Sequence, residues 1–355
     1  MKILVAPLDW GLGHATRCIP IIRACIEAGH SVELATCGSI ATLYRGEFPE
    51  LAQHEFPSYG IRYPKVGLAM PFWLLKNMPR LRAVMAAEHQ RAEELVKECG
   101  FDAIISDNRF GCYSVKAHSV YMTHQLRIAF PFPFSYFEKT GTRYHAKFMQ
   151  RFSEVWVPDV PDFPGLAGKL SHVLQMPLPV KYVGILSRFA EPVPGTPREY
   201  DFLGVISGPE PMRSSFQNRL IAALSEIPGK HAVILGTPGR PVPAEHPKNV
   251  TLFSHLETPD FARMVAGSRH IVSRSGYSTV MDMARLGASC VFVPTPGQTE
   301  QVYLGRVLRR SGFAGYLPER KLSAETLLET ALVTRRIPES PDSKGLLAAV
   351  LMQLR

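Results

Sequence analysis

Strand-like and helix-like segments alternate along the sequence, and this alternation is the feature that most constrains the fold. The chain opens with a largely apolar run, Lys2 to Leu8, typical of a parallel strand covered on both faces. A glycine loop, a helical pattern over 16–28 and a second strand over 31–36 complete one βαβ unit. The alternation continues with a helix over 81–98 and strands over 103–106, 119–122 and 154–157. The pattern predicts a doubly wound parallel sheet, which is an α/β fold.

A second alternating series begins at Asp201, after a proline-rich stretch. It contains a helix over 214–227 and strands over 201–207, 231–235, 250–253, 270–273 and 290–293. The prolines between 176 and 197 favour an extended connection, and 355 residues exceed what one hydrophobic core usually supports. We therefore expect two Rossmann-like domains with a cleft between them. The expected boundaries are a first domain over 1–175, a linker over 176–200, a second domain over 201–340, and a terminal helix over 341–355 that packs back on the first domain.

Charge and cysteine usage narrow the class of protein. The formal net charge of +9 favours anionic partners, but no block of basic residues or nucleic-acid motif accompanies it, so nucleic acid is not expected as a partner. The six cysteines lack a CxxC pair or the close spacing of a zinc site, and we expect reduced thiols and no metal. No apolar stretch approaches the ~20 residues that span a bilayer. A cytoplasmic protein is expected, with peripheral membrane contact at most.

The loop after the first strand carries an imidazole. Gly11 and Gly13 let the backbone turn tightly and approach a ligand, and His14 stands at the lip of the crevice where such folds bind ligands. A histidine can take a proton at neutral pH, so His14 is a candidate general base, although it could equally cap the helix or hydrogen-bond across a domain cleft. A nicotinamide-binding fingerprint would need a third glycine where Thr16 stands, while Glu33 lies 20 residues past Gly13, as that fingerprint requires.

The segment from Ser273 to Gln301 holds the densest group of candidate binding residues. A loop of small residues precedes a helix, and free backbone N–H groups at such a helix start suit a diphosphate. Asp282 lies about one turn into that helix, where its carboxylate could accept hydrogen bonds from two ribose hydroxyls. Glu300 and Gln301 open the next helix and could grip neighbouring hydroxyls of a hexose. Each of these features alone could be an ordinary helix cap, so the interpretation rests on their order and spacing.

This segment, together with GLGH in the first loop, resembles the GT-B glycosyltransferases of family 28, the group that includes the peptidoglycan enzyme adding N-acetylglucosamine to lipid I. The resemblance implies that the first domain binds the acceptor, with His14 facing it, and that the second binds the nucleotide sugar. The implied donor-binding positions are Gly11 and Gly13 of the first loop and Ser207, Gly208, Phe253, Ser254, Arg274, Ser275, Gly276, Ser278, Thr279, Asp282, Glu300 and Gln301. Asp282 replaces the family's glutamate, and the loop over 295–298 differs from that of the peptidoglycan enzyme.

The resemblance implies an inverting glycosyltransferase with a UDP-sugar as the family-level donor. No Asp-x-Asp motif is present, so neither a metal nor another cofactor is expected. Helix dipoles and backbone donors would stabilise the leaving diphosphate. Two alternatives stay open: a nucleotide-sugar 2-epimerase of the same fold, and a non-catalytic protein that binds the sugar nucleotide.

Acceptor-side candidates follow two apolar strands of the first half. Asp107, which we consider a reserve base or a helix cap, precedes Asn108 and Arg109, and His124 and Gln125 follow the next strand. All should edge the same cleft. Basic and aromatic residues alternate over 60–85, a pattern that fits an anionic membrane surface or a segment closing over the acceptor pocket. The acceptor itself, a glycan or a lipid-linked sugar, is not specified.

Overall fold

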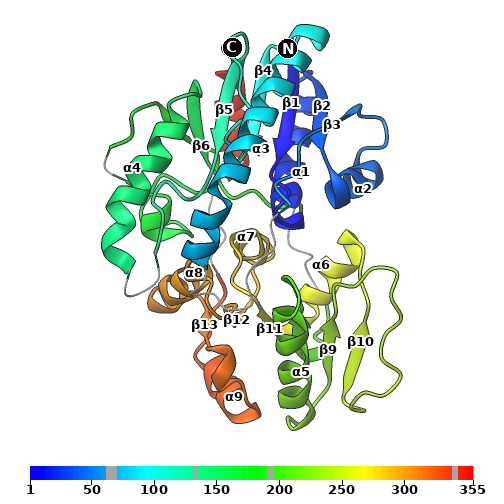
Figure 1. Cartoon of the computed structure of the whole chain (residues 1–355). Helices are drawn as coiled ribbons and strands as arrows, with labels where there is room; N and C mark the ends of the chain where they lie inside the picture. The colour runs from blue at the N-terminus through cyan, green and yellow to red at the C-terminus, as the bar shows by residue number, and fades with distance from the viewer. Residues whose placement is uncertain (61–69, 131–133, 174, 190–195, 338–342, 355) are drawn as a thin grey trace. The chain divides into compact units, whose positions relative to one another are not determined.

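The computed structural model describes residues 1–60, 70–130, 134–173, 175–189, 196–337 and 343–354, and these divide into two compact units. The first unit runs from the amino terminus to Ser187 and also contains the carboxy-terminal helix α10 (Ser343–Met352) (Figure 1). The second unit begins at Arg188. The segment 60–85 was predicted to contact a membrane surface or to close over the acceptor pocket. Its residues 61–69 lie outside the described residues, and the rest of it from Met70 onward belongs to α3.

The first unit is built on a seven-stranded parallel sheet in the order β3-β2-β1-β4-β5-β6-β7. Helix α3 lies across one face of this sheet, and α10 contacts α1 and β7 (Figure 1). Strand β7 falls in the segment interpreted as a linker, where it pairs with β6 at the sheet edge. The elements are β1 (Lys2–Pro7), α1 (Leu12–Glu27), β2 (Ser31–Thr36), α2 (Gly38–Glu47), β3 (Gln53–Glu55), α3 (Met70–Cys99), β4 (Ala103–Asp107), β5 (His118–Met122), η2 (Phe134–Phe137), α4 (Glu138–Met149), β6 (Glu154–Val157) and β7 (Val180–Tyr182).

The second unit repeats the arrangement with a six-stranded parallel sheet in the order β10-β9-β8-β11-β12-β13. Its elements are β8 (Tyr200–Val205), α5 (Met212–Ser225), β9 (His231–Ile234), β10 (Val250–Phe253), α6 (Thr258–Ala266), β11 (Ser268–Ser273), α7 (Tyr277–Arg285), β12 (Cys290–Phe292), α8 (Thr299–Arg310), β13 (Gly315–Tyr316) and α9 (Ala324–Leu332). Two parallel sheets with covering helices confirm the predicted α/β class with two Rossmann-like units.

In both sheets the strand order reverses direction between the first strand of the unit and the later strand that pairs with it on its other side. In the first unit β1 pairs with β4, and in the second β8 pairs with β11. The loops that leave the carboxyl ends of such a pair diverge, which opens the crevice where doubly wound folds bind ligands. The predicted site residues of each unit follow these central strands or their neighbours.

Two helices extend further than the sequence pattern indicated. Helix α1 begins at Leu12 instead of Thr16, so the glycine loop is shorter and His14 stands in the first turn. Helix α3 begins at Met70 instead of Leu81 and contains Pro79. The longer helix places its carboxy-terminal half against the sheet.

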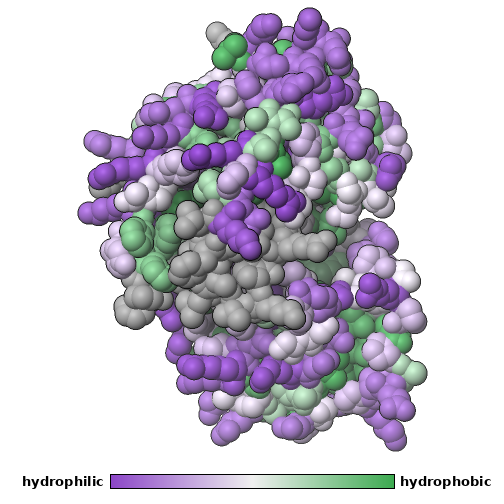
Figure 2. Space-filling model, viewed as in Figure 1, coloured by the Kyte–Doolittle hydropathy of each residue, from purple (hydrophilic) through white to green (hydrophobic). Residues whose placement is uncertain are grey.

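Each unit has its own apolar core. In the first, Leu4 and Ala6 of β1 pack with Leu95 and Val96 of α3, and all four are nearly or fully buried. In the second, Phe216 and its neighbours on α5 pack over the sheet. Hydrophilic residues cover most of the described surface visible in Figure 2. Among the described residues, none of the helices is long and apolar enough to cross a membrane.

Candidate active site and donor loops

Hydrogen bonds of its neighbours fix the glycine loop of the first unit. Gly11 precedes α1 with φ 111°, a backbone conformation that favours glycine. Asp9 anchors the loop, because its carboxylate accepts a hydrogen bond from the hydroxyl of Ser58 at 2.5 Å. The Thr16 hydroxyl donates to the carbonyl of Gly13 at 3.1 Å. These contacts fix the first turn of α1 and with it the direction of the His14 side chain.

His14 and Asp107, which the sequence suggested separately as candidate bases, form a pair. The Nδ1 atom of His14 lies 2.9 Å from Oδ2 of Asp107. Asp107 ends β4 and is in register with Pro7, the last residue of β1, so the strand end delivers the carboxylate directly beside the glycine loop. Asp107 is fully buried, whereas the His14 side chain keeps 19% of its surface exposed. The imidazole therefore connects a buried carboxylate to solvent.

Arg17 is a third member of this cluster that the sequence analysis missed. Its Nε atom donates to Asp107 at 2.9 Å, and its Nη2 atom forms a further short contact with the same carboxylate. Nη2 also lies 2.9 Å from His14 Nδ1, and Nη1 lies 3.3 Å from Nδ1 of His124. The signal in the sequence was the spacing of three between His14 and Arg17, which puts both on one face of α1.

The charges of the cluster act on one another. Burial would raise the pKa of the Asp107 carboxyl, but Arg17 and His14 hold it below its usual range. Burial and the nearby Arg17 charge lower the pKa of His14 below its ordinary 6.5, against the attraction of Asp107. At neutral pH the cluster therefore contains a carboxylate, a guanidinium and an uncharged imidazole that can still take a proton.

The other acceptor-side candidates divide into two groups. Asn108 follows Asp107 with φ 56°, and its side-chain oxygen accepts a hydrogen bond from the Tyr121 hydroxyl at 3.2 Å. His124 is buried against Arg17, and Gln125 is half-buried. Arg109, expected at the edge of the same cleft, is instead buried: it donates to the carbonyl of Pro7 at 2.7 Å and forms an ion pair with Glu88, whose Oε1 lies 2.7 Å from its Nη1. It stabilises the strand ends and is not available to a ligand.

In the second unit, the loops after β8, β10 and β11 bring these predicted donor-binding residues to the carboxyl ends of the strands. Gly208 follows β8 with φ 102°, directly after Ser207. Phe253 ends β10, and the carbonyl of Ser254 accepts a hydrogen bond from the N–H of Thr237 at 2.7 Å. Gly276 precedes α7, and a Cβ atom there would meet only Thr279 at 3.9 Å, so the loop is open at this point. Ser278 and Thr279 stand in the first turn of that helix.

Two of the predicted donor-loop residues have internal partners. Arg274 is nearly fully buried, and its Nη1 atom lies 2.7 Å from Oε2 of Glu319. It also donates to the carbonyls of Val293 and Pro294, each at 3.1 Å. The Ser275 hydroxyl donates to the carbonyl of Gln301 at 2.8 Å, which links the loop to α8. Arg274 and Ser275 therefore fix the shape of this loop.

Asp282 and the pair at the start of α8 lie nearer the surface. The Asp282 side chain is 14% exposed, and the Nε atom of Arg188 lies 3.9 Å from its Oδ2. Arg188, which the sequence analysis missed, also packs over the rings of Phe189 and Phe261. Gln301 accepts a hydrogen bond from the N–H of Thr295 at 2.8 Å, and Glu300 is half-buried beside it.

Glu33, which kept the nicotinamide alternative open, is engaged elsewhere. Its carboxylate forms an ion pair with Lys2 at 2.7 Å, near the start of β1 and away from the loop that follows Pro7. A ribose-binding carboxylate belongs at the other end of the strand, beside the glycine loop. The geometry therefore gives the nicotinamide alternative no support.

Comparison with known proteins agrees with this arrangement. Residues 250–345 match the family described as "Glycosyltransferase family 28 C-terminal domain". An "Uncharacterized glycosyltransferase" of Methanosarcina acetivorans is 20% identical over 93% of this chain and 88% of its own length. A UDP-N-acetylglucosamine–N-acetylmuramyl-(pentapeptide) pyrophosphoryl-undecaprenol N-acetylglucosamine transferase of Chelativorans sp. is 36% identical, over 25% of this chain and 24% of its own length.

Solved glycosyltransferase structures share this fold. The spinosyn rhamnosyltransferase SpnG superposes with a TM-score of 0.66 at 17% identity, over 100% of this chain and 95% of the other. The glycosyltransferase SnogD of Streptomyces nogalater superposes with a TM-score of 0.61 at 15% identity, over 100% of this chain and 93% of the other. At this level of identity the likeness establishes the fold.

Proposed function

We propose that this chain, which has the GT-B fold and resembles glycosyltransferase family 28, moves a sugar from a UDP-sugar to an acceptor hydroxyl with inversion and without a metal. The observation that carries the proposal is the 2.9 Å contact between His14 Nδ1 and Asp107. A buried carboxylate that orients a solvent-facing imidazole is the arrangement needed to activate a hydroxyl for attack.

In the proposed reaction, His14 acts as the general base. The protonated Nδ1 donates to the Asp107 carboxylate, which leaves the lone pair of Nε2 to accept the proton of the acceptor hydroxyl. The acceptor oxygen attacks the anomeric carbon, the bond from that carbon to the diphosphate oxygen breaks, and the nucleoside diphosphate departs with the electron pair. A single displacement of this kind inverts the anomeric configuration. Asp107 stabilises the imidazolium that forms, and Arg17 positions Asp107.

The second unit would hold the donor. The first turn of α7, with Ser278 and Thr279, offers backbone N–H groups to the diphosphate. Asp282 would accept hydrogen bonds from the ribose, and Glu300 with Gln301 would bind the sugar. Ser207, Gly208, Phe253 and Ser254 would line the base and phosphates. Neutralisation by helix dipoles and backbone donors makes a metal unnecessary in this scheme.

We assign uridine as the base because the 36%-identical relative is named for a UDP-sugar. The structural neighbour SpnG has been solved with thymidine diphosphate, so thymidine donors are the matched competitor in any test. The name of the same relative includes a pyrophosphoryl-undecaprenol acceptor, which supports a lipid-linked acceptor here.

A lipid-linked acceptor would require contact with an anionic membrane surface. The described residues offer one region with suitable chemistry, at η2 and the start of α4. Tyr136 is 69%, Phe137 45% and Tyr144 44% exposed, and Lys139 and Arg143 are exposed between them. Exposed aromatic rings beside basic side chains favour peripheral binding to anionic lipid.

The test is to incubate the purified protein with a panel of UDP- and dTDP-sugars, with and without candidate acceptors, and to measure bound donor and released nucleoside diphosphate. We expect UDP-sugar binding, turnover that survives a chelator, and product of inverted configuration by NMR. Asp107→Asn should retain donor binding and lose turnover. Isomerised sugar without any acceptor would instead establish the epimerase. Binding with no turnover would indicate a binding protein, and no binding of any sugar nucleotide would refute the proposal.

A further inference from the structure

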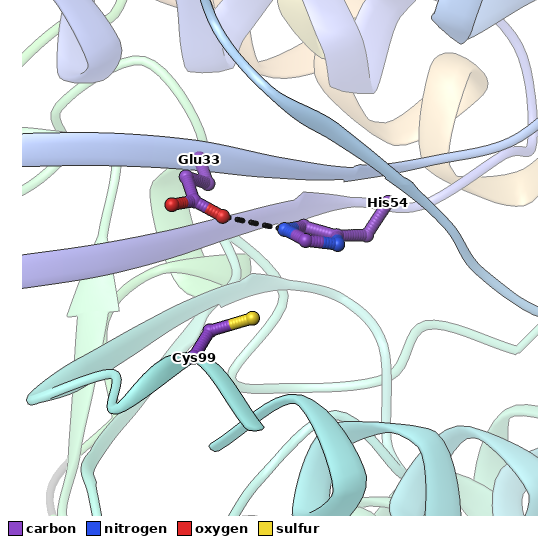
Figure 3. Close-up of side chains that lie close together, drawn as sticks. All are labelled: Glu33, His54 and Cys99. Carbon is purple, nitrogen blue, oxygen red and sulfur yellow. Dashed lines mark hydrogen bonds and ion pairs between the residues drawn. The ribbon is translucent and has the colours of Figure 1, made fainter. Parts of the chain in front are cut away.

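Three potential metal ligands meet at the edge of the first sheet, away from the His14 cluster. Glu33 comes from β2, His54 from β3 and Cys99 from the end of α3. One carboxylate oxygen, one ring nitrogen and the sulfur all lie within 4.8 Å of one another. Figure 3 shows the three side chains converging from separate elements. Because 45 residues separate His54 from Cys99, no short spacing in the sequence reveals the group.

The neighbours of the group orient two of its members. Nε2 of His54 lies 2.5 Å from Oε2 of Glu33, while Lys2 occupies the other oxygen, Oε1, at 2.7 Å. The Phe101 ring meets the His54 ring edge-on at a centroid distance of 6.0 Å and carries the Lys2 ammonium at 5.0 Å. Partners that hold a ligand from behind are what metal sites require of their surroundings.

A second cluster of the same unit shows what such a group looks like when it serves only as an ion-pair network. Glu154 of β6 stands between Lys181 at 2.7 Å and His118 at 3.6 Å. The Trp156 indole N–H also donates to Glu154, at 2.7 Å. This cluster has the lysine, the carboxylate and the histidine, but among the described residues only the Glu33 group adds a thiol within ligand distance.

We propose that Glu33, His54 and Cys99 bind a divalent transition metal ion, with zinc as the expected occupant. Carboxylate oxygen, imidazole nitrogen and thiolate sulfur are the donors that zinc accepts in tetrahedral sites. The ion takes the position between His54 and Glu33, where it binds the Nε2 lone pair of an imidazole that keeps its proton on Nδ1, and it displaces the thiol proton of Cys99, which passes to solvent. Water supplies the fourth ligand, because the His54 and Glu33 side chains keep 20% and 17% of their surface exposed.

The position of the site indicates a structural role. Glu33 and His54 lie on β2 and β3, the two strands at one edge of the sheet, whereas Asp107 ends the central strand β4. A bound ion would join the end of α3 to β2 and β3, the strands at one edge of the sheet. The proposal is independent of the sugar-transfer chemistry.

The experiment titrates Co²⁺ into reduced, metal-free, untagged full-length protein and then displaces it with Zn²⁺. We expect one equivalent to bind with a thiolate-to-cobalt charge-transfer band, and Zn²⁺ to remove that band. Cys99→Ser should lose the band, and His54→Gln should weaken binding by more than tenfold, since loss of an outer-shell partner alone typically costs about 10–100-fold. Zinc should raise the unfolding temperature of the wild type but not of these variants.

Two matched variants serve as controls. Cys37→Ser removes the other half-exposed cysteine among those described, and His118→Ala removes the histidine of the Glu154 cluster. Both should bind Co²⁺ like the wild type. A missing band in the wild type, a band that persists in Cys99→Ser, or equal losses in the control variants would overturn the site. Circular dichroism of each variant separates loss of the site from loss of the fold, and Glu33→Gln provides a third ligand substitution should one variant fail to fold.

Discussion

The two units share one topology but place different chemistry at the equivalent edge of the sheet. In the first, the loop after β1 and the end of β4 join His14 to Asp107 and Arg17, so ionisable groups meet beside solvent. In the second, the loop after β11 presents Gly276 and the hydroxyls at the start of α7. An ion pair of that unit, Arg274 with Glu319, is almost fully buried.

In the proposed function, this difference lets one scaffold support two tasks. A proton acceptor needs a titratable group that a buried counter-charge orients, as in the first unit. A diphosphate needs preorganised backbone donors, and a buried ion pair there serves to hold the loop in shape. Substitutions at corresponding points of the two units should therefore have different consequences, in kcat for one and in stability or affinity for the other.

The largest effect is expected from His14→Ala. Loss of a general base typically lowers the rate by about 10²–10⁴-fold, so kcat should fall by that amount while the Kd for the donor stays near the wild-type value. Turnover and equilibrium binding of the same sugar nucleotide measure the two quantities. Partial rescue of kcat by added imidazole would sharpen the assignment. An unchanged kcat in His14→Ala would contradict the proton-transfer role of the first unit and so remove its contrast with the second.

The buried pair of the second unit provides the next test. Glu319→Gln leaves the Arg274 guanidinium without its counter-charge, and breaking a buried pair costs about 3–5 kcal/mol in the free energy of unfolding. Urea denaturation measures the loss. Glu210→Gln is the matched control, because its ion pair with Arg213 is exposed and should contribute below about 1 kcal/mol. If Glu319→Gln is as stable as the wild type but its kcat falls as much as that of His14→Ala, the structural role of this pair is contradicted.

A smaller effect is expected from Asp282→Asn, which keeps the side-chain shape and removes the charge. Hydrogen bonds to a charged group contribute about 1.5–3 kcal/mol, so the Kd for the donor should rise by about 10–150-fold. Calorimetric titration with the nucleotide sugar and with the nucleoside diphosphate checks this. Asp260→Asn, at an exposed position of α6, is the control and should bind normally. Equal affinities for Asp282→Asn and the wild type would remove Asp282 from the donor site.

The sequence predicts the central strands well because β1, β4 and β5 are short, largely apolar and buried, whereas the half-buried β3 and β7 were not predicted. The strand over 154–157 was placed without error, and the fold class is confirmed. The glycine loops could be located since each follows a recognisable strand. The start of α1 could not, because Leu12 and Gly13 give no helix-start signal, although they adopt helical geometry after Gly11.

Contacts between residues far apart in the sequence could not be predicted from the sequence. His14 and Asp107 were each proposed as a base, but only the register of β1 with β4 brings them into one pair. Glu319 lies 45 residues after Arg274, and neither residue type predicts burial. The Glu33 group depends in the same way on three elements meeting. The donor-binding assignments rest on resemblance and geometry and stay predictions.

The last and smallest effect concerns pH. Because burial and Arg17 lower the pKa of His14, the acid limb of kcat/KM should lie below pH 6.5. As pH falls through this pKa, the imidazole takes a proton and can no longer act as a base. Arg17→Gln removes a positive charge beside the ring, so the pKa of His14 should rise and the acid limb should move to higher pH. A profile of kcat/KM against pH measures the shift.

Arg23→Gln is the matched control for this prediction. Arg23 lies on the same helix, but its side chain is 46% exposed and pairs with Glu47, so solvent screens its charge. Its acid limb should coincide with that of the wild type. At a pH well above both acid limbs, the His14 imidazole is deprotonated in either protein. The activity of Arg17→Gln relative to the wild type should therefore be higher there than near the acid limb. A limb that stays in place in Arg17→Gln would mean that the pH dependence belongs to a group other than His14, and the proton-transfer role of the first unit would then have to be assigned elsewhere.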